Sequence, residues 1–142
     1  MEGKFFFSTK ALIIKDNRFL AMYTMKDGRR KWDMPGGRME YGEMPEETLK
    51  REIREEISLD IKPIKLVDTW KLEDDEGFRV VGVIYHCEVL GGEVTVSDEH
   101  DGCQWIDIEN FEKVFDRAIF ADRMKNWNWE KIIESDVLFT NL

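Results

Sequence analysis

Residues 36–59 read GGRMEYGEMPEETLKREIREEISL, and they contain a helix-forming segment with several acidic residues. Pro45 suits the first turn of a helix, because its missing N–H would have no helical partner there. The two glutamates that follow complement the positive end of the helix dipole, and the next helix breaker is Pro63. We therefore predict a helix over residues 45–57. Three apolar residues of this helix share one stripe that can face a sheet: Leu49, Ile53 and Ile57.

The same helix carries three glutamates on a second patch. Glu52, Glu55 and Glu56 fall within an arc of roughly 100° when placed at helical spacing. Like charges four residues apart cost about 0.2–0.5 kcal/mol, and partial burial beside apolar residues raises that cost. A bound cation would offset this repulsion between the glutamates. Carboxylate oxygens favour Mg²⁺ or Mn²⁺ as that cation. Taken alone, three glutamates also fit an ordinary solvated helix face.

The spacing around these glutamates is specific. Gly37 is followed after five residues by Glu43 and after seven more by residues 51–59, REIREEISL. This pattern resembles the signature of the Nudix family, and the preceding WDMPGG at residues 32–37 resembles its usual flank. Ser58 is the one departure, because the family has glycine there. We expect a left-handed residue at this helix end, mildly strained in serine.

The resemblance implies a fold and an activity. It implies an α/β (α+β) protein, a Nudix-type α/β/α sandwich in which a mixed β-sheet lies between helices, and we expect one domain over residues 1–142. It also implies Mg²⁺-dependent hydrolysis of a diphosphate linkage, by attack of water at phosphorus. The substrate would be a small nucleotide-like diphosphate such as a nucleoside triphosphate or another nucleoside diphosphate derivative.

The resemblance also assigns roles to residues. The implied metal ligands are the carboxylates of the helix and one backbone carbonyl: Gly36, Glu52, Glu55 and Glu56. Either Glu52 or Glu99 would act as the general base, since the family draws the base from the helix or from a later loop. Arg51 would orient the helix glutamates, and Glu43 would tie the preceding loop to the helix.

Three further residues are candidates for substrate binding. Gly37 would allow close backbone approach, Arg38 would meet phosphates, and Trp32 would offer a ring for stacking on a base.

The rest of the chain predicts strands before and after the helix and more helix towards the C-terminus. Apolar and β-branched runs separated by turn signals predict these strands. We expect a hairpin over residues 5–25, a polar loop over 26–31, strands over 61–72, 78–90, 93–97 and 103–106, and one or two amphipathic helices within 111–132.

Composition excludes several kinds of partner. Thirty acidic against 21 basic residues give a formal charge of −9, which would repel a nucleic-acid backbone. No run of eighteen apolar residues occurs, so we expect no membrane contact. Cys87 and Cys103 form no metal-binding motif and predict free thiols in the cytoplasm. Exposed strand edges and segment 127–129 are candidate surfaces for a homodimer.

Three other functional classes compete with the hydrolase. A Nudix-like module that senses a nucleotide without cutting it would commonly lack part of the metal set, which this chain keeps. An acidic interaction domain would have no ligand at the glutamate patch. An isomerase acting on a prenyl diphosphate would need a reactive acid or thiol pair, and the sequence around the two cysteines does not indicate one.

Overall fold

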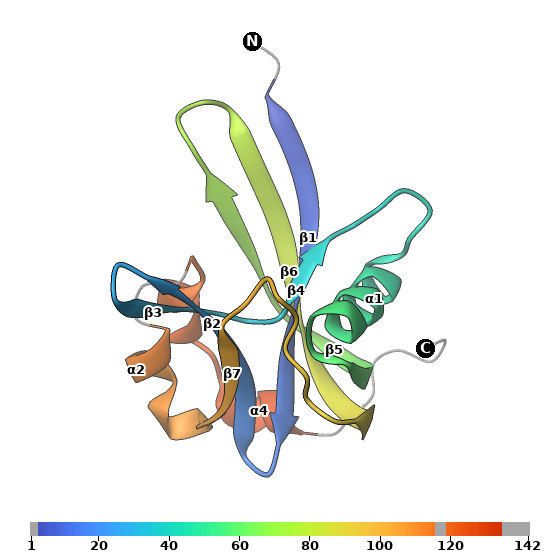
Figure 1. The fold of residues 1–142 in the computed structure, drawn as a ribbon, viewed down its shortest axis with the longest axis vertical. Coiled ribbons are helices and arrows are strands. Elements are labelled where there is room, and N and C mark those ends of the chain that lie inside the picture. The colour runs from blue at the N-terminus through green and yellow to red at the C-terminus, as the bar shows by residue number, and fades with distance from the viewer. Residues whose placement is uncertain (1–2, 116–118, 135–142) are drawn as a thin grey trace.

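The computed structural model describes residues 3–115 and 119–134, and its centre is a mixed, seven-stranded sheet (Figure 1). The strands are β1 (Lys4–Lys15), β2 (Arg18–Lys26), β3 (Arg29–Asp33), β4 (Gly36–Arg38), β5 (Leu59–Glu73), β6 (Phe78–Gly92) and β7 (Gly102–Asp107). The main path runs β3-β2-β1-β6-β5, while β4 pairs with β1 and β7 pairs with β2.

Strand β1 organises the sheet. It runs parallel to β6 from Lys4 to Ile13 and antiparallel to β4, where Thr9 lies opposite Gly37 and Lys10 opposite Gly36. Strands β5 and β6 form a long antiparallel hairpin on one side. On the other side β2 is flanked by β3 and β7, both antiparallel to it.

Each face of the sheet is covered by helix. Helix α1 (Pro45–Ile57) packs on one face, and the C-terminal helical segments pack on the opposite face (Figure 1). These segments are a 3₁₀ turn, η1 (Ile108–Asn110), and three short helices, α2 (Phe111–Val114), α3 (Ala121–Met124) and α4 (Trp129–Ile133). Two apolar cores result, one on each face, and the predicted α/β/α sandwich with a mixed sheet is confirmed.

Helix α1 begins and ends where its sequence predicts. Leu49, Ile53 and Ile57 are fully buried against the sheet, and burying a side chain of this kind contributes about 1.5–3 kcal/mol. At the C-terminal end Ser58 adopts the left-handed conformation, with φ 60° and ψ 28°, and its N–H donates to the carbonyl of Arg54 at 3.1 Å. A residue other than glycine therefore closes this helix at a conformational cost.

Three local predictions were wrong. Residues 29–31 belong to edge strand β3, not to a loop, and their charged side chains suit an exposed edge. Residues 93–97 form no strand, because the N–H groups of Thr95 and Ser97 instead donate to the last carbonyls of α1. The predicted one or two amphipathic helices are three short helices in the described residues, and positions 116–118 of that stretch lie outside them.

Two further features bear on the predictions of partners. The rings of Trp127 and Trp129 lie 5.3 Å apart and pack against the C-terminal core, so this segment contributes to the interior of the chain. Within residues 3–115 and 119–134, none of the helices is long and apolar enough to cross a bilayer.

Candidate active site

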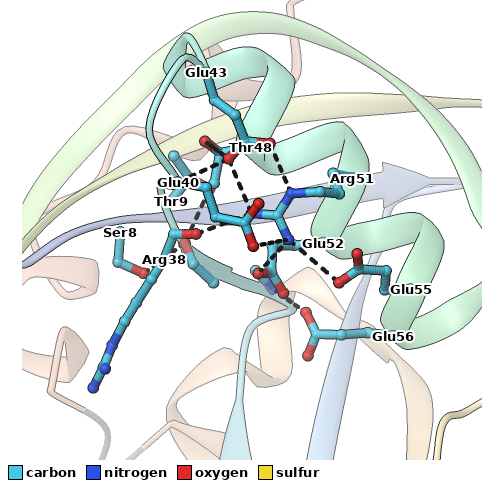
Figure 2. A network of polar contacts seen from close by, with 12 residues as sticks. Ser8, Thr9, Arg38, Glu40, Glu43, Thr48, Arg51, Glu52, Glu55 and Glu56 are labelled. Atoms are coloured by element: carbon cyan, nitrogen blue, oxygen red, sulfur yellow. Dashed lines mark hydrogen bonds and ion pairs between the residues drawn. The ribbon is translucent and has the colours of Figure 1, made fainter.

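Arg51, on helix α1, is the centre of a network of polar contacts with neighbouring carboxylates (Figure 2). Its Nε and Nη2 donate to the two carboxylate oxygens of Glu43 at 2.7 and 3.0 Å. Its Nη1 donates to Glu52 at 3.0 Å and to Glu55 at 3.3 Å, and Nη2 also reaches the backbone carbonyl of Arg38 at 3.1 Å. One guanidinium therefore fixes three carboxylates and the strand β4 backbone relative to one another.

Glu43 connects the loop after β4 to helix α1 through its hydrogen bonds. Besides Arg51, it accepts hydrogen bonds from the backbone N–H of Glu40 at 2.9 Å and from the hydroxyl of Thr48 at 3.0 Å. The hydrogen bonds from Arg51 are the main reason that the pKa of Glu43 falls to about 2. Glu43 is therefore a permanently charged support for the loop.

Glu52 lies directly against the backbone of Gly37. A Cβ placed on Gly37 would lie 2.5 and 2.6 Å from the two carboxylate oxygens of Glu52, well inside van der Waals contact. Burial raises the pKa of Glu52, although the Arg51 hydrogen bond opposes that shift. The glycine thus makes room for a carboxylate in a poorly solvated place.

Glu56 is the most deeply buried of the helix acids, with 6% of its surface exposed. Its Oε1 accepts a hydrogen bond from the backbone N–H of Gly36 at 2.8 Å, and its Oε2 lies 3.7 Å from Nδ1 of His100. Burial raises the pKa of Glu56 to about 7, against the opposing effects of the Gly36 N–H and the charge of Lys10. An adjacent cation would restore its ionised form.

The glutamates form one wall of a cleft of about 810 Å³. The loop after β6 also lines the cleft, and it brings Glu99 into the same cleft as the helix acids. The lining residues are Lys10, Gly36, Gly37, Arg38, Glu40, Arg51, Glu52, Glu55, Glu56, Ser97, Asp98, Glu99 and His100.

A second cavity of about 850 Å³ lies between β5 and the C-terminal helices. Its most buried carboxylate, Asp68, already accepts hydrogen bonds from Arg123 and from the indole N–H of Trp127. These charges neutralise one another, so this cavity offers less chemistry than the acid-lined cleft.

The donor set of the cleft fits a hard divalent cation. Glu52, Glu55 and Glu56 offer carboxylate oxygens, and Glu55 is open to solvent with 60% of its side chain exposed. In the part of the chain that the structure describes, no three acidic, histidine or cysteine side chains already converge as a metal cluster. Nη1 of Arg51 instead bridges Glu52 and Glu55, and these bonds would have to rearrange when a metal enters.

The predicted substrate-binding residues are only partly brought together. Gly37 and Arg38 line the cleft, and the guanidinium of Arg38 lies 4.1 Å from the ring centre of Phe6, pointing away from the glutamates (Figure 2). Trp32 is not among the lining residues. Its ring packs against Tyr23 at 5.1 Å.

The sequence analysis missed Lys10, which lines the cleft from strand β1. Its ammonium forms an ion pair with Asp33 at 2.9 Å, and its side chain is only 12% exposed. The available signal was a single lysine inside the apolar run of residues 5–14, where a charged side chain needs a partner.

Comparison with known proteins agrees with this geometry. The family model described as NUDIX domain matches residues 6–127. An ADP-ribose pyrophosphatase of Methanocaldococcus jannaschii is 31% identical over 118 residues, which cover 80% of this chain and 70% of that protein. A nucleoside triphosphatase NudI of an Enterobacter strain is 32% identical over 91 residues, covering 56% of this chain and 64% of the relative.

Solved structures show the same fold. The crystal structure of a MutT protein from Methanosarcina mazei superposes with a TM-score of 0.78 at 24% identity, covering 92% of this chain and 98% of the other. A NUDIX hydrolase from Nitrosomonas europaea superposes with a TM-score of 0.76 at 16% identity, covering 95% and 94%. Signature, fold and family model therefore agree, and the chain belongs to the Nudix hydrolase family, whose members generally depend on divalent metals.

Proposed function

We propose that this protein hydrolyses a diphosphate linkage in a nucleoside triphosphate or another nucleoside diphosphate derivative, with Mg²⁺ as cofactor and Mn²⁺ as a substitute. The observation that carries the proposal is the Arg51 network, which holds Glu52 and Glu55 beside the buried Glu56 along one wall of the cleft. Three carboxylates share the one guanidinium there, counting Glu43, and Glu56 adds a fourth acid beside them. The excess negative charge favours a dication.

The proposed metal ligands are Glu52, Glu55, Glu56 and the backbone carbonyl of Gly36. A bound dication supplies neutralisation of phosphate oxygens and lowers the pKa of a coordinated water. The chain supplies the positioning. Arg51 fixes the glutamates, and the N–H of Gly36 holds one oxygen of Glu56, which leaves its other oxygen towards the cleft.

The base that takes the proton from water is Glu52 or Glu99. Both line the cleft, and the charge of Glu99 contributes to the raised pKa of Glu52. Glu52 is largely buried and already bonded to Arg51, whereas Glu99 lies in an exposed loop. Comparing Glu52→Gln with Glu99→Gln separates the two, because loss of the base lowers kcat with little change in Mn²⁺ affinity, whereas loss of a ligand changes both.

Substrate contacts are proposed for Gly37, Arg38 and Trp32. Gly37 and Arg38 both line the cleft, where a diphosphate would bind. The guanidinium of Arg38 would have to turn away from the ring of Phe6 to reach a phosphate there. Trp32 stays a prediction for the base, because it lies outside the lining residues. The named relatives act on ADP-ribose or nucleoside triphosphates, so these are the first substrates to try.

The test is a release assay over nucleoside triphosphates, nucleotide sugars, ADP-ribose and dinucleoside polyphosphates. Each substrate is incubated with Mg²⁺, with Mn²⁺ and with excess chelator, and phosphate-containing products are quantified. We expect at least one substrate to be cut in a metal-dependent way and Glu56→Gln to lose that activity. Glu46→Gln is the matched control, because it removes a carboxylate from the same helix outside the cleft. Metal-dependent binding of a substrate without cleavage would favour the sensing module instead.

Four broader proposals accompany this function. We propose that residues 1–142 are one domain, and that the protein forms a homodimer, which sedimentation analysis can test. Cys87 and Cys103 are free thiols, which supports a reducing compartment such as the cytoplasm. The partner is a small molecule, since the formal charge of −9 disfavours nucleic acid.

A further inference from the structure

Lys10 has an unusual position for a lysine. It lies within strand β1 opposite Gly36, and its side chain lines the same cleft as the glutamates although it is only 12% exposed. Side chains alternate along a strand, so Lys10 extends on the side of Leu12, which belongs to the core under the C-terminal helices. Ala11 packs on the opposite side, against α1. Lys10 therefore enters the cleft from the face opposite the helix acids.

The ammonium of Lys10 has one donor left. It donates to Asp33 Oδ2 at 2.9 Å and to the backbone carbonyl of Met34 at 3.2 Å. An ammonium group carries three N–H donors. Among the residues that the structure describes, no third acceptor is recorded for it, and Lys10 itself lines the cleft.

The other two strong cations of the cleft are already engaged. Arg51 donates to three carboxylates and one carbonyl, so its donors are used in holding the site together. The guanidinium of Arg38 stacks on Phe6, away from the glutamates. Lys10 is thus the cation best placed to meet an anion at the floor of the cleft, next to the backbone of Gly36.

We propose that Lys10 is a phosphate-contacting residue that binds a non-bridging oxygen of the diphosphate opposite the metal-holding glutamates. The inference rests on the proposed function, since it needs a diphosphate in this cleft. Asp33 and the carbonyl of Met34 orient the ammonium of Lys10, and its third N–H donates to the diphosphate. The diphosphate would then be held between helix α1 on one side and strand β1 on the other.

A purely structural role for the ion pair makes a different prediction. Lys10 and Asp33 could act only as a clamp on the turn of residues 33–36, which presents the N–H of Gly36 to Glu56. Removing either partner would then loosen the turn and weaken metal binding equally. A phosphate contact depends on Lys10 itself and leaves the metal ligands in place.

The experiment measures ligand and metal binding separately from turnover. Inorganic pyrophosphate and α,β-methylene-ADP serve as probes of diphosphate binding in saturating Mn²⁺, and free Mn²⁺ is measured by electron paramagnetic resonance without probe. The variants are Lys10→Met, Lys10→Arg and Asp33→Asn. Lys15→Met is the matched control, since it removes an exposed lysine from the end of the same strand.

We expect Lys10→Met to bind both probes about 10- to 100-fold more weakly, the effect of one hydrogen bond to a charged group. Mn²⁺ affinity should stay within about twofold, Lys10→Arg should recover part of the probe affinity, and Lys15→Met should keep the wild-type affinity. Asp33→Asn should lose less probe affinity than Lys10→Met, because it removes a group that orients the ammonium and not the ammonium itself. Unchanged probe affinity in Lys10→Met would overturn the inference. So would equal losses of probe and Mn²⁺ affinity in Lys10→Met and Asp33→Asn. If the wild-type protein cleaves no substrate of the panel, the proposed function fails instead.

Discussion

Replacing Gly37 by alanine tests the packing of the site with the smallest change the chain allows. Gly37 does not adopt a positive φ, so its backbone conformation is open to alanine. The added methyl group would meet the Glu52 carboxylate, with its two oxygens at 2.5 and 2.6 Å. Ordinary contact needs roughly 3.5 Å, so the carboxylate must retreat by about 1 Å. Because Glu52 is a flexible side chain, the fold can absorb this shift.

The reaction rate, in contrast, should be sensitive to this shift of the Glu52 carboxylate. A displacement of about 1 Å at a reacting group costs on the order of a hundredfold in rate, equivalent to about 2.7 kcal/mol of transition-state stabilisation. We therefore expect Gly37→Ala to lose about a hundredfold in kcat/KM, whether Glu52 is the base or a metal ligand. The midpoint of thermal unfolding should change little, since alanine also lowers the entropy of the unfolded chain.

The assay combines kcat/KM with Mg²⁺, Mn²⁺ affinity and the thermal midpoint for Gly37→Ala and for Gly91→Ala. Gly91 is the matched control, because its φ is not positive and an added Cβ would meet no atom within 4 Å. Wild-type kcat/KM and Mn²⁺ affinity in Gly37→Ala would refute the reasoning. That result would mean that the observed place of the Glu52 carboxylate is not the place that the reaction needs.

Three further predictions concern the neighbouring groups. Glu55→Gln and Glu56→Gln should each lose at least about a hundredfold in turnover with the fold retained, as judged by circular dichroism, and full activity in both would contradict the metal assignment. Arg51→Lys should lose about 10- to 100-fold in Mn²⁺ affinity or activity, because one ammonium cannot replace the forked donors to Glu43 and Glu52. An unchanged Mn²⁺ affinity and activity would argue that Arg51 does not position the metal ligands. Burial lowers the pKa of His86 to about 4 in the folded chain. Between about pH 6.5 and 4 this histidine is therefore protonated in the unfolded chain but neutral in the folded chain. Stability should fall by about 3 kcal/mol as the pH drops from about 6.5 to 4, and urea unfolding of His86→Gln should lack that part of the slope.

Local signals explain which parts of the fold the sequence predicts well. Helix α1 begins at Pro45 and ends at Ile57 as expected, because a proline, early acids and an apolar stripe all act within a few residues of one another. Segment 93–97 was mistaken for a strand, because its pattern does not reveal that its N–H groups serve the open carbonyls at the end of α1. Strand β3 is an exposed edge, so it lacks the apolar alternation that identifies a strand.

The candidate site divides in the same way. The glutamates and Arg51 belong to one motif on one helix, and in the structure they line one cleft. Lys10 and His100 reach the cleft only through the pairing of distant strands and loops, which spacing in the sequence does not encode. Trp32, an aromatic residue next to the motif, packs on Tyr23 outside the lining residues of the cleft, so its role in binding a base stays a prediction.

The charge of the site resolves the apparent conflict between an acidic protein and an anionic substrate. Arg51 compensates one negative charge, while Glu43, Glu52 and Glu55 all bond to it and Glu56 accepts a hydrogen bond from the backbone N–H of Gly36. Arg51 thus sets the position of the carboxylates and leaves most of their charge unbalanced. That excess attracts dications, and dications with open coordination sites attract phosphate. The formal charge of −9 therefore favours ligands that arrive with metal and opposes those, such as nucleic acid, that arrive without it.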